Sequence, residues 1–495
     1  MLDILLAASP IIVVLVGMIG LKKSAMKVGP IAMMYTIILG IFYFSGTSKE
    51  MLVSFEKGIL DGIKIVWLIF AAFTMLMMMM GTGAMDRIKQ VIAGLTNDRR
   101  IHVLIIAMMF GVFLEGAAGA GTPAAIAAPF LVGLGFSPVL AATASLISNS
   151  VPVSWGGAGV TTIMGSAAVR DFMTVEQASS MAGRIHMIGA IILPFLIIAV
   201  IFGRKGFRGL IPFILFSGGF MSVTLFVFSN FIGPEVTSMS TGLLTIIASL
   251  VFLKTVKVNT PKEFLYKPEL SNVQSTMSTF RAFSPYLILI ILLPAVRYSF
   301  PLSSLAKYGY TVWVGAVIYS SAFLGSLILR VKLSDFGNYS VTAFKKVIPA
   351  LVAMCSLLVV SDIMVKTGMM KLLASTLAAV AGKGYPFIAV AIGSLGAFMT
   401  GTNLGSNIMF GPMHVQAATT LMQNPITVFA GQNVGGSIGN MICPNNVVAV
   451  ATTVGVLGRE GELMRKVFPA FLVFLLIYGL VAAFYTHYMF SNYGI

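Results

Sequence analysis

This chain contains repeated apolar stretches, each long enough to cross a lipid bilayer as a helix. They restrict the folds that the chain can adopt. We place uninterrupted stretches near 3–20, 28–46, 62–82, 184–203, 209–229, 237–255, 282–299, 311–330, 347–366 and 467–488. Because an α-helix rises about 1.5 Å per residue, about 20 apolar residues cross a hydrocarbon core of about 30 Å. Only 10% of the residues are charged, whereas soluble domains average about 25%. The sequence therefore predicts an all-α polytopic membrane protein.

Two further regions, roughly 101–170 and 386–457, are apolar but interrupted by Gly, Pro, Asn, Ser and Thr. Irregular backbone at membrane depth is stable only where protein or water surrounds it. We interpret each region as a re-entrant hairpin followed by one broken helix. The hairpins fall at about 101–135 and about 386–421, and the broken helices at 138–169 and 425–457. Each hairpin arm is predicted to hold only about 13 residues, or about 20 Å of helix, which is too short to cross the membrane.

The two halves of the sequence match at a constant offset of 285 residues. At this offset the segment TGAMDRIKQVIAGL (82–95) falls on TGMMKLLASTLAAV (367–380). Further matches follow without a gap, with Gly111, Phe113 and Gly116 falling on Gly396, Phe398 and Gly401. We interpret the pattern as a duplicated five-helix unit. The predicted domains are a first repeat at 1–203, linking helices with a cytoplasmic loop at 204–280, and a second repeat at 281–495.

The distribution of basic residues predicts the topology. The spans add up to about 12 transmembrane helices plus two re-entrant hairpins. With the N-terminus and the C-terminus both outside the cell, most of the 32 basic residues fall in cytoplasmic loops, as the positive-inside rule requires. The two hairpins then enter the membrane from opposite sides, so the repeats are predicted to be inverted, as in many secondary transporters. This loop bias explains the net charge of +16, and we expect no nucleic-acid partner.

One ionisable residue, Glu115, stands in the segment FLEGAAGAGTP (113–123), beside the predicted tip of the first hairpin. A buried carboxylate is unfavourable when ionised, so protonation near neutral pH becomes accessible to it. A proton-coupling group needs this property, and we predict that role for Glu115. The alternative is a structural carboxylate that accepts hydrogen bonds from its own hairpin tip. The residue at the matching position of the second half is Thr400, so the two tips differ chemically.

Glycine and neutral polar residues gather at four interruptions, which are the two hairpin tips and the two helix breaks. Helices that begin there direct N–H groups and the positive ends of their dipoles inward, where they can hold an anion. Glycine lets the backbone approach a ligand, and Asn, Ser and Thr add neutral donors. The predicted substrate-binding residues are Gly116, Gly121, Thr122, Ser148, Asn149, Gly156, Gly157, Thr402, Asn403, Ser406, Asn407, Gln432, Asn433, Gly435, Gly436 and Ser437. The alternative is packing of small residues between helices, which does not explain asparagines in apolar segments.

The remaining polar residues give weaker signals. The four interruptions contain no Lys or Arg, so we predict that the bound anion carries little charge. His414 on the second hairpin and His186 near the outer end of a span are possible substrate or proton groups, and His186 with Arg184 is otherwise interpreted as interfacial. The 2 cysteines and 4 histidines form no group with metal-ligand spacing, so the sequence predicts no metal site and no cofactor.

Four blocks around the interruptions are long enough to compare with known families. They are FLEGAAGAGTPAAIAAPFLVGLGFSP (113–138), ISNSVPVSWGGAG (147–159), GAFMTGTNLGSNIMFG (396–411) and NMICPNNVVAVATTVGVLGREGEL (440–463). With RAFSPYLILIILL (281–293), they resemble the L-lactate permease family over nearly the whole chain. The resemblance implies uptake of L-lactate, and often D-lactate or glycolate, together with protons across a bacterial or archaeal inner membrane. It also implies kinship with a wider ion-transporter superfamily, whose paired hairpins and broken helices move as one elevator-like block.

The leading interpretation is a proton-coupled symporter of L-lactate and related small 2-hydroxy monocarboxylates in the cell inner membrane. Its partners would be the monocarboxylate, protons and the lipid bilayer. A Na⁺-coupled carboxylate transporter is the alternative, because carbonyl oxygens in the interruptions could coordinate Na⁺. A membrane-embedded enzyme is less favoured, since Glu115 with His414 is the only candidate catalytic pair in the sequence. A channel needs an open path, and inverted hairpins argue against one.

Overall fold

Helices make up almost the whole of this protein. The computed structural model describes residues 2–17, 21, 23, 25–94, 96–119, 122–265, 276–299, 310–456 and 459–494. Within these residues the single β pairing is an isolated bridge between Asp98 and Leu265. The predicted all-α class is therefore confirmed.

The described helices fall into three groups along the chain. The first half holds α1 (Leu2–Leu15), α2 (Ala25–Phe42), α3 (Ser48–Gly81), α4 (Ala84–Ala93), α5 (Arg99–Val103), η2 (Leu104–Phe110), α6 (Gly111–Ala118), α7 (Thr122–Gly133), α8 (Pro138–Ser148), η3 (Pro152–Trp155), α9 (Gly156–Ala167) and α10 (Val175–Phe202). The linking segment holds η4 (Gly203–Phe207), α11 (Ile211–Val227), η5 (Phe228–Ile232), α12 (Pro234–Thr255) and η6 (Lys262–Phe264). The second half holds α13 (Thr279–Ser299), α15 (Tyr310–Ile328), α16 (Leu333–Lys366), α17 (Met369–Ala381), η7 (Gly382–Gly384), α18 (Tyr385–Thr400), α19 (Asn403–Thr420), α20 (Pro425–Gly439), α21 (Pro444–Thr453), α22 (Glu460–Phe484) and η8 (Tyr485–Met489).

Seven helical stretches of the described chain are long and apolar enough to cross a membrane. They are Arg99–Ala117, Val175–Phe207, Ile211–Ile232, Pro234–Thr255, Leu333–Lys366, Met369–Phe398 and Glu460–Met489. Shorter apolar helices are Leu2–Val14, Met26–Phe42, Pro138–Ser148 and Gly315–Ile328. The chain is thus a multi-pass membrane protein, whereas the 12 crossings and the two re-entrant hairpins stay predictions.

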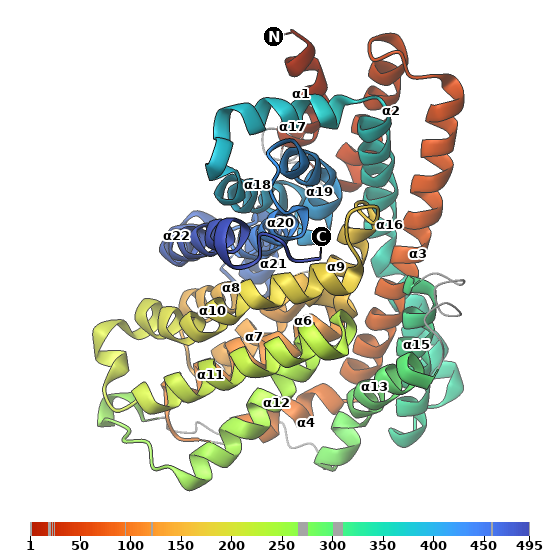
Figure 1. The fold of residues 1–495 in the computed structure, drawn as a ribbon. Helices are drawn as coiled ribbons and strands as arrows, with labels where there is room; N and C mark the ends of the chain where they lie inside the picture. Colours follow the sequence, from red (N-terminus) through yellow and green to blue (C-terminus); the bar gives the residue numbers. More distant parts are fainter. Residues whose placement is uncertain are drawn as a thin grey trace.

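The helices α3 and α16 are the longest in the fold and occupy matching positions in the two halves. Each holds 34 residues, and both their first and their last residues lie 285 positions apart. They stand upright in Figure 1, whereas α10 and α11 run across the view. Near one end Gly58 of α3 lies against Val359 of α16, and near the other end Gly81 lies against Tyr339. These two matching helices therefore run in opposite directions, the relationship that an inverted repeat produces.

Both long helices begin earlier than the spans predicted at 62–82 and 347–366. The reason is that their first halves carry charged and polar residues, which the apolar pattern did not mark as helix. A capping box fixes the start of α3. In it the side chain of Thr47 accepts a hydrogen bond from the N–H of Glu50, and the Glu50 carboxylate accepts one from the N–H of Thr47.

Charges within the two long helices are paired across their contact. Asp362 and Lys366 of α16 form an ion pair, with Oδ2 of Asp362 2.9 Å from Nζ of Lys366. Lys57 of α3 joins it, with Nζ 2.6 Å from Oδ1 of the same carboxylate. One acid of α16 thus binds a lysine from each long helix, and this pairing lets charged residues extend helices that continue as apolar spans.

The first arm of the predicted hairpin is longer than expected. Asp98 caps the helix by accepting a hydrogen bond from the N–H of Arg100 at 2.9 Å, and α5, η2 and α6 continue from there. The resulting stretch, Arg99–Ala117, holds 19 residues and is fully buried. The predicted arm of about 13 residues is therefore wrong here. The predicted hairpin begins only at about 101, because charged residues precede it, but Arg100 is buried in an ion pair with Asp98, at 2.6 Å.

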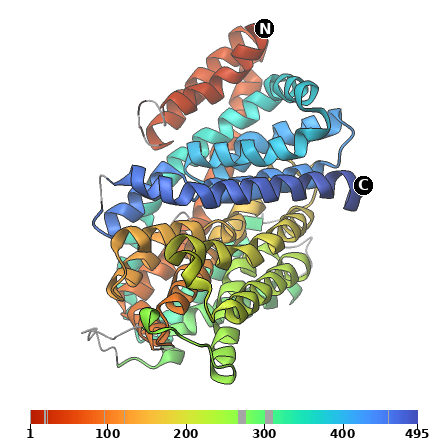
Figure 2. The same ribbon diagram turned by 90° about the vertical axis from the view of Figure 1, so that its left-hand side faces the viewer.

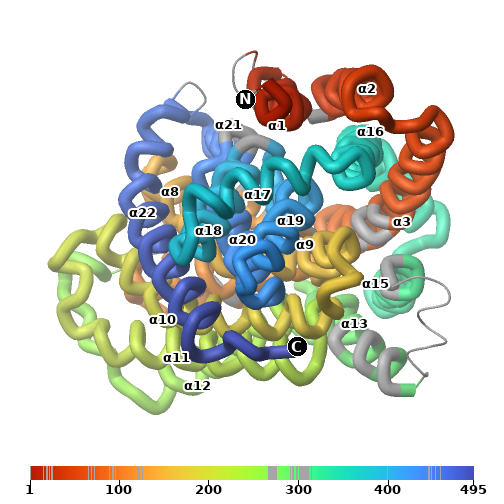
Figure 3. The backbone as a smooth tube through the Cα atoms, turned by 45° about the horizontal axis from the view of Figure 1, so that its top comes forward, coloured from red at the N-terminus to blue at the C-terminus, as the bar shows by residue number. Residues whose placement is uncertain are grey.

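The interrupted segments of the two halves pack against each other. The helix α9 contacts α19, α7 contacts α21, and α10 contacts α20. Figure 2 shows helices of the second half, in blue, stacked on helices of the first half, in orange and yellow. In Figure 3, α9 lies beside α19 although the two are far apart in the sequence. This packing brings both predicted helix breaks and both predicted tips into one region.

Candidate functional site

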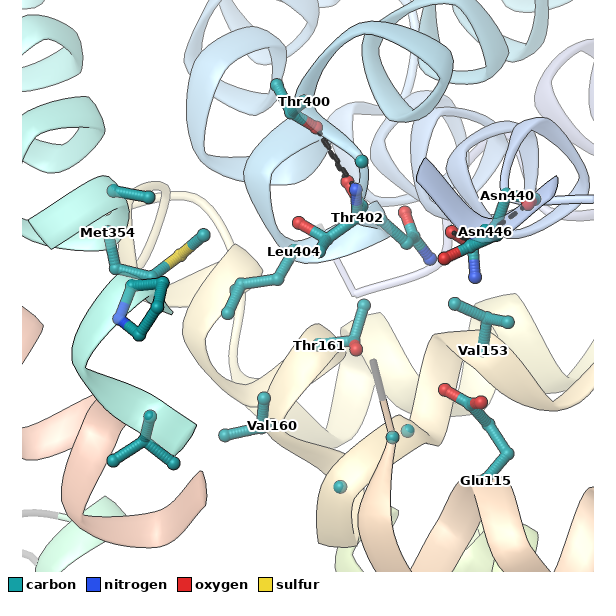
Figure 4. A pocket seen from close by; sticks show the side chains of 18 of the residues that line it. Glu115, Val153, Val160, Thr161, Met354, Thr400, Thr402, Leu404, Asn440 and Asn446 are labelled. Carbon is teal, nitrogen blue, oxygen red and sulfur yellow. Dashed lines mark hydrogen bonds between the residues drawn. The ribbon is translucent and has the colours of Figure 1, made fainter. Parts of the chain in front are cut away.

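Residues from all four interruptions line one cavity of about 410 Å³. The first half contributes Glu115, Gly119, Val153, Gly156, Gly157, Val160 and Thr161, and the second half contributes Thr400, Gly401, Thr402, Asn403, Leu404, Asn440, Asn446 and Ala449. Figure 4 shows the labelled side chains of both halves facing each other across this space. The cavity thus has polar groups from both halves and apolar groups such as Val153, Val160 and Leu404 on the same surface.

Glu115, on α6, is the acidic residue of the cavity wall. It is 1% exposed, and its carboxylate points toward the cavity in Figure 4. Asn149, another predicted site residue, lies beside it. Oε2 of Glu115 has no hydrogen-bond partner among the described residues. An ionised carboxylate with an unused acceptor is unfavourable in buried surroundings, so a proton or a donor group of a ligand would stabilise it.

The first helix break depends on left-handed backbone. Gly157, Ala158 and Gly159 have φ values of 57°, 56° and 78°, so regular helix resumes only at Val160. A residue with a Cβ is strained in this region, and Ala158 is the one non-glycine of the three. Gly119 at the first tip has φ of 63°, and a Cβ built on it would overlap the backbone of Gly157. The tip and the break are therefore in direct backbone contact, which no larger residue at 119 would allow.

The second tip presents the beginning of α19 to the cavity. Gly401, with φ of 80°, ends α18, and the side chain of Thr402 caps α19 by accepting a hydrogen bond from the N–H of Gly405 at 3.0 Å. The first N–H groups of a helix have no acceptor within the helix. Asn403 and Leu404, which begin α19, both line the cavity. The positive end of an 18-residue helix therefore lies at the cavity wall, where it favours an anion.

Behind the wall, asparagine side chains form a hydrogen-bond network around Asn433. Its Oδ1 accepts hydrogen bonds from Nδ2 of Asn403 and from Nδ2 of Asn407, both at 3.0 Å. Its Nδ2 donates to Oγ1 of Thr162 on α9 at 2.8 Å, which joins the second half to the first. Among these four residues only Asn403 lines the cavity. The network therefore fixes the position of Asn403 at the wall.

The predicted substrate-binding residues divide into three sets by their position. Gly156, Gly157, Thr402 and Asn403 line the cavity, together with Glu115, the predicted proton-coupling residue. Ser148, Asn149, Ser406, Asn407, Gln432, Asn433, Gly435, Gly436 and Ser437 are buried outside its lining. Gly116 packs against the backbone of Met239 on α12. Gly121 lies outside the described residues, as does the side chain of Thr122.

The second helix break is shorter than the interruption predicted near 433–446. The helix α20 is regular up to Gly439, so Gln432 and Asn433, placed in the break by the sequence, belong to the helix interior. The interruption covers 440–443, between α20 and α21. The glycines of α20 serve close packing, since a Cβ at Gly435 would overlap the carbonyl of Val390 on α18. Asn440 begins the interruption and Asn446 follows it, and both line the cavity. Nδ2 of Asn446 lies 2.6 Å from Oδ1 of Asn440.

The two histidines considered as possible proton or substrate groups lie away from the cavity lining. His186 is fully buried within the protein, with Nδ1 bonded to Oη of Tyr478 at 2.8 Å and Nε2 bonded to Oγ of Ser154 at 2.9 Å. Nδ1 of His414 bonds to Oη of Tyr385 at 2.9 Å. Because His414 does not line the cavity with Glu115, the candidate catalytic pair is not assembled there. No three His, Cys, Asp or Glu side chains of the described chain gather as a metal site.

The helix α16 contributes a wall that the sequence reasoning missed. Its lining residues are Lys346, Val347, Pro349, Ala353 and Met354. Residues 345–346 fall between the apolar stretches at 311–330 and 347–366, and the four interruptions contain no cation. The repeat contains a signal that indicates this position. Lys346 falls on Asp61 at the 285-residue offset, so the long helix of each half has a charged residue at the same place.

A second cavity, of about 170 Å³, lies between the long helices, the end of α9 and the middle of α19. At the 285-residue offset its Asp61 falls on Lys346 of the larger cavity, and its Leu358 falls on Phe73 of the larger cavity. The parts of the two cavities that the long helices line therefore occupy matching places.

Comparisons of the sequence with known proteins agree with one another. The sequence profile of the family described as L-lactate permease matches residues 3–317 and 294–490. Glycolate permease GlcA of Escherichia coli K12 is 28% identical over 535 residues, covering 97% of this chain and 95% of that protein. L-lactate permease of Bacillus subtilis 168 is 28% identical over 519 residues, covering 92% and 90%. L-lactate permease of Escherichia coli K12 is 27% identical over 530 residues, covering 97% and 95%.

A solved structure shares the fold. MtrF of Neisseria gonorrhoeae, described with a class of antimetabolite efflux pumps, superposes with a TM-score of 0.55 over 94% of this chain and 96% of that chain. The two sequences are 12% identical, so the likeness concerns the arrangement of helices alone.

Proposed function

This chain belongs to the L-lactate permease family, and from this membership we propose that it carries L-lactate and related small 2-hydroxy monocarboxylates, including D-lactate and glycolate, into the cell together with protons. A family of permeases makes the protein a transporter rather than an enzyme. Its relatives named as lactate and glycolate permeases cover nearly its full length and support the choice of substrates.

The observation that carries the proposal is the cavity lined by all four interruptions. It holds one buried carboxylate, Glu115, and the beginning of α19, so a group that binds protons and a group that favours anions face the same space. A symporter for an acid needs both within reach of one substrate. The volume of about 410 Å³ leaves ample room for a three-carbon acid and water.

The substrate carboxylate binds at the start of α19, beside Asn403 and the N–H groups that begin the helix. The 2-hydroxyl group meets the side chains of Asn440 and Asn446 on the same wall, which offer both donors and acceptors. The methyl group of lactate packs on apolar residues such as Val160 and Met354. Neutral donors and a helix dipole compensate one negative charge, which favours monocarboxylates over acids of higher charge.

Coupling follows from the charge of Glu115. When Glu115 is ionised, an incoming carboxylate adds a second negative charge to a buried space, which is strongly unfavourable. When Glu115 is protonated, substrate binds beside a neutral acid that can donate a hydrogen bond. Substrate and proton therefore bind together, and neither crosses efficiently alone.

Alternating access uses the inverted repeats. In the proposed topology of 12 crossings and two re-entrant hairpins, both termini lie outside, in the inner membrane. The larger cavity opens to the cytoplasm, and the second cavity marks the corresponding path on the outer side. The antiparallel packing of α3 and α16 and the matching places of the two cavities along these helices support this arrangement.

The test is uptake of labelled L-lactate into proteoliposomes that contain the purified protein. An inward proton gradient without Na⁺ is expected to drive accumulation above equilibrium, and excess unlabelled glycolate is expected to compete. Accumulation that requires a Na⁺ gradient and ignores the pH gradient would instead support the Na⁺-coupled alternative. Absence of lactate uptake under both gradients would overturn the proposed substrate.

A further inference from the structure

The larger cavity has an unequal distribution of charge. Among its described lining residues, Lys346 is the one cation and Glu115 is the one carboxylate. Glu115 is buried, whereas Lys346 is exposed, so the lysine stands at the mouth and the acid stands inside. The wall that α16 supplies runs from Lys346 to Met354, which is about 12 Å of helix.

Three of the other lysines in the two long helices have partners that neutralise them. Lys57 and Lys366 both bind Asp362, and Lys64 lies 3.1 Å from Asp61. None of the ion pairs in the described part of the chain uses Lys346. Its ammonium group is therefore available to a ligand, and its flexible stem lets the charge reach over the cavity mouth.

We propose that Lys346 is a specificity-determining residue, whose ammonium group attracts the substrate carboxylate to the cavity mouth and offsets the negative charge of Glu115 behind it. The inference rests on the proposed function. A fixed positive charge at the mouth of a cleft raises the local concentration of anions and favours them over neutral compounds of the same shape. With Glu115 protonated, the loaded cavity holds one ammonium group and one carboxylate and is neutral.

The inference predicts an effect on substrate capture from one side of the membrane. Removal of the charge should raise KM for substrate that arrives at the face where the cavity opens, and it should leave the maximal rate nearly unchanged. In the proposed topology this is the cytoplasmic face, which inside-out vesicles expose to the medium. Salt should weaken the effect, because the Debye length falls from about 30 Å at 0.01 M to about 8 Å at 0.15 M.

The experiment compares lactate uptake by inside-out and right-side-out vesicles that contain wild-type protein, Lys346→Gln, Lys346→Arg or Lys345→Gln. Lys345 is the matched control, because it is an exposed neighbour on the same helix that does not line the cavity. Lys346→Gln is expected to raise KM by about three- to tenfold in inside-out vesicles at low salt, the range for one unit charge acting through water at close distance. The rise should shrink at 0.3 M salt, and Lys346→Arg should restore the wild-type KM.

Four outcomes would overturn the inference while wild-type protein transports lactate. They are an unchanged KM in Lys346→Gln, an equal rise in Lys345→Gln, a rise that salt does not weaken, and a rise of the same size in right-side-out vesicles. Absence of lactate uptake by wild-type protein in both orientations would overturn the proposed function itself, and this inference with it.

Discussion

The carboxylate of Glu115 lies in the space that a side chain at Gly156 would occupy. A Cβ built on Gly156 would overlap Oε1 of Glu115. Gly156 has φ of −60° and ψ of 145°, a conformation that any residue adopts. The acid beside it, and not backbone strain, therefore explains why glycine stands here. Glu115, beside the first predicted hairpin tip, and Gly156, at the first helix break, are therefore in close contact at the cavity wall.

Gly156→Ala is expected to displace the Glu115 side chain and to lower the free energy of unfolding by about 1–3 kcal/mol, because a methyl group would enter filled space. Thermal unfolding of the purified protein measures this loss. Gly219→Ala on α11 is the control, since nothing lies within 4 Å of its added Cβ, and alanine there should stabilise the helix. In Glu115→Asp with Gly156→Ala, the shorter acid should relieve part of the loss. Fully additive losses would contradict the contact.

Asn403→Ala is expected to weaken lactate binding about ten- to hundredfold, because a hydrogen bond to a charged group is worth about 1.5–3 kcal/mol. Equilibrium binding of labelled lactate to purified protein measures the change. Asn433→Ala should weaken binding as well, since Asn433 holds Asn403 in place through the bond at 3.0 Å. The exposed Asn338 of α16 provides the control, and Asn338→Ala should bind as wild type does. Wild-type affinity in Asn403→Ala would place the substrate elsewhere.

Apolar length and interruption were enough to predict the helical class, the four interruptions and the position of Glu115 on a buried wall. These features are local, because an apolar stretch of about 18 residues and a glycine-rich break can each be recognised from a short segment of the sequence. The 285-residue offset came from direct matches between segments and recurs in the bounds of α3 and α16.

Features that depend on tertiary partners could not be predicted in this way. Asn433 lies inside a regular helix, where its side-chain amide donates a hydrogen bond to Thr162. Thr162 is 271 residues away in the sequence, so no local pattern predicts that partner. The first half of α16 carries charges, yet it is helical because α3 packs along it. For the same reason the span predicted at 347–366 begins only after Lys346, which lies inside α16 and lines the larger cavity.

Single cysteines at Asn97, Lys262 and Lys383 test the proposed inverted topology. All three positions are exposed, and the native Cys355 and Cys443 are buried, which keeps background labelling low. A membrane-impermeant maleimide is expected to label Asn97→Cys and Lys262→Cys from the cytoplasmic side and Lys383→Cys from outside. Asn97 and Lys383 precede the two predicted hairpins, so their labelling from the same side would contradict inverted repeats.

Glu115→Gln separates a coupling role from a structural one. Glutamine keeps the shape of the protonated acid and removes its ability to release a proton, so substrate should still bind and the loaded protein should still move. Exchange of external for internal lactate is therefore expected to continue, whereas accumulation driven by a pH gradient should be lost. Both are measured in the same proteoliposomes, with thermal unfolding to confirm the fold. A purely structural carboxylate gives another pattern, in which the variant either unfolds or performs both activities. Strong gradient-driven accumulation by well-folded Glu115→Gln would remove the coupling role from Glu115, and the buried His186 and His414 would be examined in its place.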